Sequence, residues 1–214
     1  MVRKSLSLIM LAALVGCGGK AAKPPEPPKP SPYQNLPLTA AALAGQKVAV
    51  LPLTLAVPDT ALAGDSILGS RAKVLAWADS LMMEALLGRA PEITWVGPAE
   101  LRRAARRATG IASDPDRLGH AVLRDVNLKF VPDPLRSQIR TLVALVDARY
   151  CLVPTAVVFL KEPDGRIKSE MMLVLVDART GAPAWRSIAS ATGDTPGQAF
   201  RASLSNVFRI EGVQ

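Results

Sequence analysis

Seven prolines lie between residues 18 and 37, and they limit where a folded domain can begin. This segment also contains Gly18 and Gly19, carries three lysines against one glutamate, and has almost no apolar bulk. Proline fixes the backbone dihedral φ and lacks an amide hydrogen, so such a run forms neither a helix nor a sheet core. We predict an extended spacer of polyproline type that rises roughly 3 Å per residue. A folded domain is expected to start near Gln46.

The residues before the spacer are typical of an export signal. Arg3 and Lys4 precede an apolar run over residues 6–15, which only Ser7 interrupts. The run is much shorter than the roughly 20 apolar residues that cross a bilayer as a helix. It ends in Leu14-Val15-Gly16-Cys17, which resembles the lipobox of bacterial lipoproteins. The alternative is an ordinary signal peptide with an incidental cysteine.

The lipobox resemblance implies lipidation of Cys17. In that family the cysteine thiol takes a diacylglycerol, the signal is cut before it, and the new amino group is acylated. Several acyl chains anchor a protein firmly, since each buried CH₂ contributes about 0.8 kcal/mol. Gly18 stands where Asp retains many lipoproteins in the inner membrane, so the expected location is the periplasmic face of the outer membrane. The predicted parts are a signal peptide (1–16), an acylated cysteine with a proline-rich tether (17–45) and one α/β domain (46–214).

The periodicity of apolar residues after Gln46 predicts an α/β (α+β) domain with helices packed on a mixed β-sheet. Pro154 lies inside an expected strand and indicates an edge position or a bulge. Ser70 is a candidate helix cap, and residues 57–69 are expected to form a loop. The predicted order is β-α-β-α-α-α-β-β-β-α, with strands at 46–53, 92–96, 150–160, 167–177 and 184–189, and helices at 70–89, 99–108, 116–125, 135–148 and 196–209.

Four short motifs in this region, taken together and in order, resemble the TolB amino-terminal-like group. That group includes the curli-secretion lipoprotein and the penicillin-binding-protein activator lipoproteins. Arg149 stands where the group usually has Asp, and Trp185 follows the last motif. The resemblance covers residues 46–209 and rests on Val48-Ala49-Val50-Leu51-Pro52, Trp95-Val96-Gly97-Pro98-Ala99-Glu100-Leu101, Ala148-Arg149-Tyr150-Cys151-Leu152-Val153 and Leu175-Val176-Asp177-Ala178-Arg179-Thr180-Gly181.

The resemblance implies a small α/β domain used for protein contacts, since members are not enzymes as a rule. The activators reach through the cell wall on a spacer to touch a synthase. The curli protein forms a pore through long strand-rich insertions, but residues 54–69 and 111–148 do not have the alternating pattern of barrel hairpins.

The residues themselves give little support for catalysis or metal binding. Two cysteines and one histidine are too few for a Cys/His zinc site, and there is no Gly-x-Ser-x-Gly elbow, P-loop or dinucleotide motif. His120 is interpreted as a surface or capping residue, and Cys151 as a buried strand residue. A carboxylate site stays open, with Asp59, Asp65, Glu84 and Asp177 as its candidates. We expect no enzyme, no metal and no cofactor.

The clearest charge feature of a chain with net charge +8 is a pair of arginine doublets. Their spacing of four residues places them on one side of a helix, as a ridge that could bind an acidic envelope protein, the phosphate of lipopolysaccharide or a cell-wall component. The alternative is a plain solvated helix face. Nucleic acid is excluded as a partner by export. The predicted docking face consists of Arg102, Arg103, Arg106 and Arg107.

Three functions follow from these observations. The first is a non-catalytic outer-membrane lipoprotein whose domain binds another envelope component, as a synthase activator or an assembly adaptor. The second is an oligomerising secretion or assembly component of the curli type. The third is an envelope enzyme with an unrecognised carboxylate site.

Overall fold

The computed structural model describes residues 40–207. The predicted signal peptide, Cys17 and most of the tether therefore lie outside the described residues. The helices are α1 (Arg71–Arg89), α2 (Pro98–Arg107), α3 (Leu135–Leu145) and α4 (Pro196–Ser205). The strands are β1 (Lys47–Val50), β2 (Ala56–Pro58), β3 (Thr94–Val96), β4 (Tyr150–Lys161), β5 (Ile167–Asp177) and β6 (Ala182–Gly193). Short 3-10 turns are η1 (Ala40–Leu43), η2 (Thr60–Leu62), η3 (Pro115–Arg117) and η4 (His120–Arg124).

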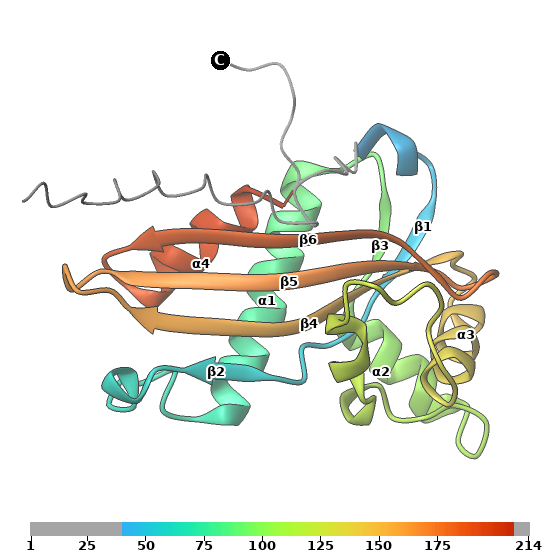
Figure 1. Ribbon diagram of the computed structural model, residues 1–214. Coiled ribbons are helices and arrows are strands. Elements are labelled where there is room, and N and C mark those ends of the chain that lie inside the picture. Colours follow the sequence, from blue (N-terminus) through green and yellow to red (C-terminus); the bar gives the residue numbers. More distant parts are fainter. Residues whose placement is uncertain (1–39, 208–214) are drawn as a thin grey trace, which may run out of the picture. The chain divides into compact units, whose positions relative to one another are not determined.

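The strands form one mixed sheet, which confirms the predicted α/β class (Figure 1). Its order is β3-β1-β4-β5-β6, with β2 added beside β4. β1 runs parallel to β3 and β4, whereas β4, β5 and β6 form an antiparallel meander. The short parallel strands are joined through helices, as parallel strands require, and the long antiparallel strands are joined by tight turns.

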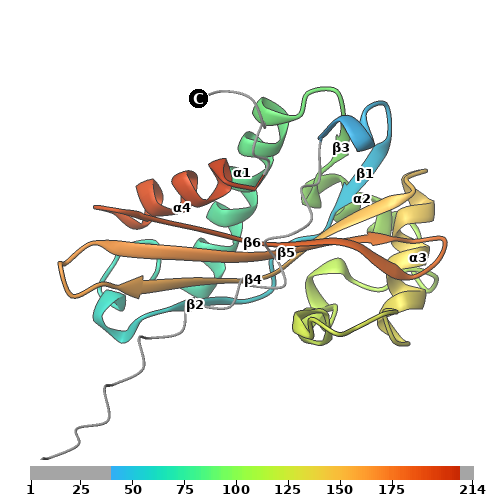
Figure 2. The ribbon, with the colours of Figure 1, turned by 45° about the horizontal axis from the view of Figure 1, so that its top comes forward.

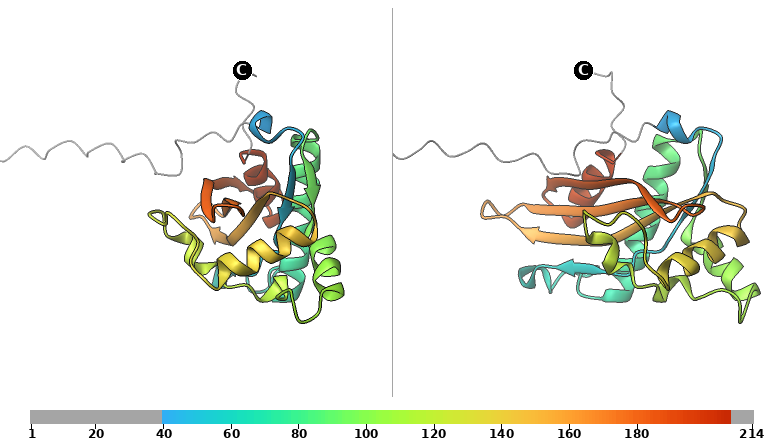
Figure 3. Two further views of the ribbon diagram at one scale, coloured as in Figure 1. Left: turned by 90° about the vertical axis from the view of Figure 1, so that its right-hand side faces the viewer. Right: turned by 45° about the vertical axis from the view of Figure 1, so that its right-hand side comes forward.

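Helices cover the two faces of the sheet and create two apolar clusters. α1 and α4 pack on one face, where Trp77, Phe159 and Phe200 meet with ring centroids 5.4–6.0 Å apart. α2 and α3 pack on the opposite face over Ala49 and Val153. Figure 2 shows α4 along one side of the long strands and the η3–η4 segment on the other. Figure 3 shows α2 and α3 side by side.

A bulge in β4 changes which of its residues face each cluster. The pairing with β5 shifts between Pro154 and Ala156, so Leu152 and Val157 face the same cluster although they are five residues apart. A regular strand would put residues an odd number apart on opposite faces. The predicted bulge at Pro154 is confirmed. β4 is not an edge strand, but on its other side the pairing with β1 ends at Leu152 and the pairing with β2 begins at Val157, so Pro154 lies where that ladder is interrupted.

Two arginines join the segment 124–128 to the sheet. Arg124 donates from Nη2 to the Thr155 carbonyl at 3.3 Å. Arg186 on β6 donates from Nη2 to the Leu128 carbonyl at 2.9 Å and from Nη1 to that of Val126. These arginine contacts hold residues 124–128 in place, most of which lie outside regular secondary structure.

Other differences from the sequence prediction have local causes. The predicted loop 57–69 begins with β2, which pairs with a strand a hundred residues away and is too short for its pattern to be recognised. The predicted helix 116–125 is replaced by η3 and η4, because Gly119 between them has φ −80° and ψ 79°. Ser70 precedes α1, but its side chain makes no capping hydrogen bond.

The last two predicted helices are shorter than expected. α3 ends at Leu145, because Asp147 takes a φ of +51° and the amides of Asp147 and Ala148 bond back to Ala144 and Val143. α4 starts at the predicted Pro196, behind a Thr195 cap that accepts from the Gln198 amide at 3.2 Å. The residues predicted to extend it to 209 lie partly outside the described range. Within residues 40–207, no helix is both long and apolar enough to cross a membrane.

Candidate functional site

Helix α2 carries the predicted arginine ridge, and the sequence explains its position. Pro98 starts the helix behind Gly97, and Glu100 lies in the first turn, where its charge suits the helix dipole. Leu101, Ala104 and Ala105 are buried against the α2–α3 side of the sheet. The opposite side of the helix is exposed and carries Arg103, Arg106 and Arg107. Within residues 40–207, none of these three arginines forms an ion pair.

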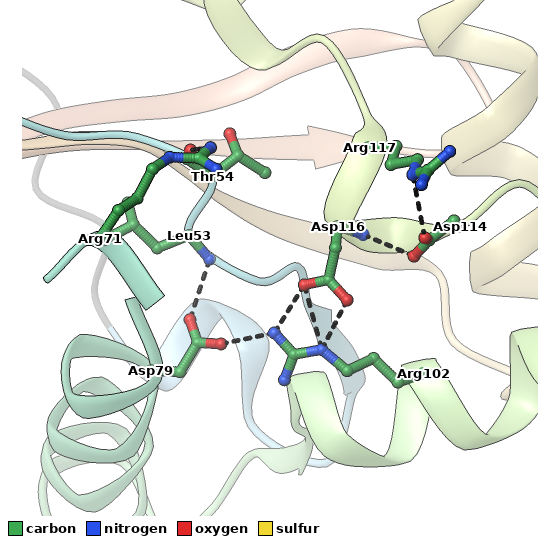
Figure 4. Close-up of polar contacts among 8 residues, drawn as sticks. All are labelled: Leu53, Thr54, Arg71, Asp79, Arg102, Asp114, Asp116 and Arg117. Atoms are coloured by element: carbon green, nitrogen blue, oxygen red, sulfur yellow. Dashed lines mark hydrogen bonds and ion pairs between the residues drawn. The ribbon is translucent and has the colours of Figure 1, made fainter. Parts of the chain in front are cut away.

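Arg102 has a different environment from the other three arginines. Its Nη2 lies 2.9 Å from Oδ2 of Asp79 and 2.7 Å from Oδ1 of Asp116, and its Nε lies 2.9 Å from Oδ2 of Asp116 (Figure 4). The Asp116 carboxylate, together with Asp79, raises the pKa of the Arg102 guanidinium. Arg102 thus joins α2 to α1 and to η3, and it is not part of the exposed set.

Asp79 is the buried member of this cluster. Its side chain is 9% exposed, and its Oδ1 accepts the Leu53 amide at 2.9 Å. Burial raises the pKa of this carboxyl, and the hydrogen bonds from Leu53 and Arg102 offset only part of that effect. The sequence gives one sign that Asp79 is buried: it follows Ala78, an apolar position of the predicted helix 70–89. The spacing of residues 79, 102 and 116 does not indicate that they meet.

The Asp79–Arg102–Asp116 cluster lies close to the carboxyl end of β1. Asp79 accepts the amide of Leu53, three residues after β1 ends, and Arg102 is on α2, the helix that follows β3. Arg71 closes the adjacent loop by donating from Nη2 to the Thr54 carbonyl at 2.9 Å (Figure 4).

A groove of about 340 Å³ separates α2 from η3. Its wall is of mixed charge, because Arg106 comes from α2 while Asp114 and Asp116 come from the η3 side. Asp114 is occupied locally: it accepts the Asp116 amide at 3.1 Å and lies 3.6 Å from Nε of Arg117 (Figure 4). Of the three exposed arginines of α2, Arg106 lines this groove, whereas Arg103 and Arg107 do not.

His120 is neither a surface nor a capping residue, so that prediction is wrong. It is 2% exposed, since η4 packs it against the bulged part of β4. Neither ring nitrogen makes a well-formed hydrogen bond with the described residues. Burial lowers the pKa of His120 to about 4, opposed by the nearby Pro154 carbonyl and reinforced by the charge of Arg124.

The other candidate groups have structural partners. Cys151 is fully buried, as predicted, and burial raises the pKa of its thiol. Asp59 caps η2, and Asp65 accepts the amides of Ile67 and Leu68. Glu84 lies 3.8 Å from Arg201. Among the described residues, no three His, Cys, Asp or Glu side chains gather in a way that could hold a metal ion.

Comparison with solved structures finds distant similarity to several proteins, including the following three. The LpoB C-terminal domain from Salmonella enterica is 17% identical at a TM-score of 0.41, over 69% of this chain and 83% of that one. A PelC dodecamer from Paraburkholderia phytofirmans is 16% identical at a TM-score of 0.40, and the match covers 77% of this chain and 86% of that one. Lipoprotein GNA1162 from Neisseria meningitidis is 14% identical at a TM-score of 0.32, and the match covers 70% of this chain and 82% of that one. The motifs predicted a resemblance to envelope lipoproteins, and these solved structures confirm it as a distant similarity of fold. The similarity does not show what this chain binds.

No family model matches the sequence, and no curated protein does.

Proposed function

We propose that this protein is a non-catalytic, lipid-anchored protein on the periplasmic face of the bacterial outer membrane, whose α/β domain binds another component of the envelope. Cys17 is the proposed anchor, and residues 18 to about 40 are the proposed tether. The partner is an acidic envelope protein or an acidic component of the cell wall. The single observation that carries the docking proposal is the exposed set Arg103, Arg106 and Arg107 on α2, none of which forms an ion pair with another residue of the range 40–207.

The geometry of α2 supports a docking role for these three arginines. A helix holds residues three and four apart as neighbours, so Arg103, Arg106 and Arg107 present their guanidinium groups on one side. Arg102 keeps this helix in place from the adjacent side, through Asp79 and Asp116. Guanidinium groups bind carboxylates and phosphates through paired hydrogen bonds, so an acidic surface is the complementary partner. In this proposal Arg102 positions the helix, and the other three arginines contact the partner.

The anchor is tested on the native product. Mass spectrometry of its amino-terminal peptide should find Cys17 as the first residue, with a diacylglycerol on sulfur and an acyl group on nitrogen. A product that keeps Met1, or one without added fatty mass, would contradict the proposal.

The docking face is tested by capture of partners with the tagged full chain after cross-linking in the envelope. The variant Arg103→Ser/Arg106→Ser/Arg107→Ser should lose the captured component. The control Lys161→Ser/Arg166→Ser/Arg201→Ser also removes three exposed positive charges, away from α2, and should keep it. Equal capture by both variants would refute the α2 face.

The alternative function, an oligomerising assembly component, predicts a different size in solution. Sedimentation of the full chain in detergent at several concentrations separates the two functions. A ring of fixed stoichiometry would favour assembly, and a monomer would favour an adaptor.

A further inference from the structure

A second groove, of about 370 Å³, lies at the other end of the α2–α3 side of the sheet. Figures 1 and 2 both show the β5–β6 turn next to α3, where this groove is formed. Small apolar residues make its floor, and three arginines from three different segments surround it. The lining residues are Arg140, Val143, Ala144, Ala148, Arg149, Ala178 and Arg179.

The turn that carries Arg179 is fixed by hydrogen bonds at both ends. The Asp177 carbonyl accepts the Gly181 amide at 2.8 Å, and Asp177 Oδ1 accepts the Arg179 amide at 2.9 Å. Gly181 has a φ of +74°, which allows the tight reversal into β6. The Ala178 amide bonds to the Arg149 carbonyl at 3.0 Å. The backbone of Arg179 is thus held in place at the edge of the groove.

Arg149 is held by its side chain as well. Its Nη2 lies 2.9 Å from Oδ2 of Asp177, and its guanidinium lies 4.9 Å from the centroid of the Tyr150 ring. Asp177 is therefore neutralised by a residue of the same groove. A guanidinium has five N–H donors, and one hydrogen bond to Asp177 leaves others for a ligand.

The groove has an excess of positive charge. Arg140 and Arg179 are exposed, and neither forms an ion pair within residues 40–207. Asp147, at the end of α3, lies 3.7 Å from Lys47. With Asp177 paired to Arg149, the guanidinium groups of Arg140 and Arg179 beside the apolar floor have no ion-pair partner in the described part of the chain.

We propose that this groove binds an acidic peptide segment of a partner protein, with carboxylates on either side of a small apolar side chain. The floor of Val143, Ala144, Ala148 and Ala178 suits side chains such as Ala or Val. The arginines stand on α3, before β4 and in the β5–β6 turn, so they match carboxylates spread along a chain. A single phosphate group would need donors that converge on one point. This site is separate from the α2 arginines and does not depend on the lipid anchor.

The test uses the full chain purified in detergent and a fluorescein-labelled peptide of four Glu-Ala repeats. Fluorescence anisotropy measures its Kd, and a peptide of four Gln-Ala repeats serves as the neutral probe. Arg140→Ser/Arg179→Ser should weaken binding of the acidic peptide about tenfold or more, because two charged contacts are lost. The matched control Arg103→Ser/Arg107→Ser removes the same charge from α2 and should change the Kd less than about twofold.

Three results would overturn the proposal. Equal weakening by the two double variants would mean non-specific attraction to a basic protein. Equal binding of the Gln-Ala peptide would remove the role of the carboxylates. Loss of binding to phosphatidylglycerol vesicles in Arg140→Ser/Arg179→Ser, with peptide binding unchanged, would assign the groove to lipid. If the α2 triple variant still captured the envelope component, the α2 docking face would be refuted, but the peptide result for this groove would be unaffected. The two proposals can therefore fail separately.

Both exposed arginines can be replaced without touching the core, and far-UV circular dichroism checks that the variants fold. The charge reversal Arg140→Glu/Arg179→Glu gives an independent reading. It should abolish binding of the acidic peptide and allow binding of a Lys-Ala repeat peptide. Unchanged preference for the acidic peptide would also overturn the proposal.

Discussion

Arg149 Nη2 donates to Asp177 Oδ2 at 2.9 Å, and this pair ties the start of β4 to the end of β5. Tyr150 and Asp177 are also register partners in the sheet. Asp177 in turn accepts the Arg179 amide, so one carboxylate organises a strand start and the following turn. Arg149, which stands where the TolB-like group usually has Asp, therefore pairs with Asp177 of the motif 175–181.

Asp177→Asn should destabilise the fold by about 1 kcal/mol, mainly through the weaker acceptor for the Arg179 amide, because exposed Arg149 adds little in water. The hydrogen bonds from Arg149 and Arg179 outweigh burial and keep the pKa of Asp177 below 3.8. Its contribution is present above pH 3.8 and is lost as the pH falls through the folded-state pKa. Urea unfolding at pH 7 measures the change. Asp164→Asn, which removes an exposed partner of Arg166, should have a smaller effect, and the reverse ranking would contradict this role.

The local elements of the fold could be predicted from the sequence where one short pattern determines them. The alternation of residues 167–177 gave β5 with its observed ends, and Pro154 indicated the bulge. β2 could not be predicted, because three residues are too few to show a strand pattern and their conformation depends on pairing with the distant β4. Spacing placed the arginines on one helix but could not show that Arg102 pairs with Asp79 and Asp116. The groove of Arg140, Arg149 and Arg179 depends on tertiary structure alone.

The Asp79–Arg102 contact should be more important for stability than an exposed ion pair. Asp79→Ala or Arg102→Ala alone should cost about 3 kcal/mol, because each leaves a buried polar group without its partner. Burial raises the pKa of Asp79, so its ionisation costs stability as the pH rises through that pKa, and Arg102 offsets this cost.

A double-mutant cycle measures the coupling between these two residues. Asp79→Leu/Arg102→Leu should destabilise less than the sum of the two single Leu variants, since the unpaired charge is absent. Arg103→Ala, one position along α2 and exposed, is the control and should be near neutral. Strict additivity of the two Leu substitutions would show that the contact is not coupled.

His120 should make the fold less stable in acid. The unfolded chain binds a proton near pH 6.5, but burial keeps folded His120 neutral down to about pH 4. Stability from this group is therefore complete above pH 6.5 and falls as the pH drops toward 4. At pH 4.5 the loss should be about 2.5 kcal/mol. His120 is the single histidine of the sequence, so no other imidazole contributes.

The control for this pH effect is His120→Leu, which fills the same buried position without a titrating group. The difference in unfolding free energy between wild type and variant should change between pH 7.5 and pH 4.5, in favour of the variant at low pH. Carboxylate titration is common to both proteins and cancels. A difference independent of pH would show that His120 is protonated equally in both states.

The number of reactive thiols should report on both cysteines at once. Cys151 is fully buried on β4, and burial raises the pKa of its thiol, so a disulfide reagent at pH 8 should not modify it in the folded protein. In denaturant Cys151 becomes reactive, while a Cys17 thioether has no thiol to give. The reduced native product should therefore give no thiol when folded and one when unfolded. Cys151→Ala should give none in either state. Two thiols in denaturant would refute lipidation of Cys17, and one in the folded state that Cys151→Ala removes would refute the burial of Cys151.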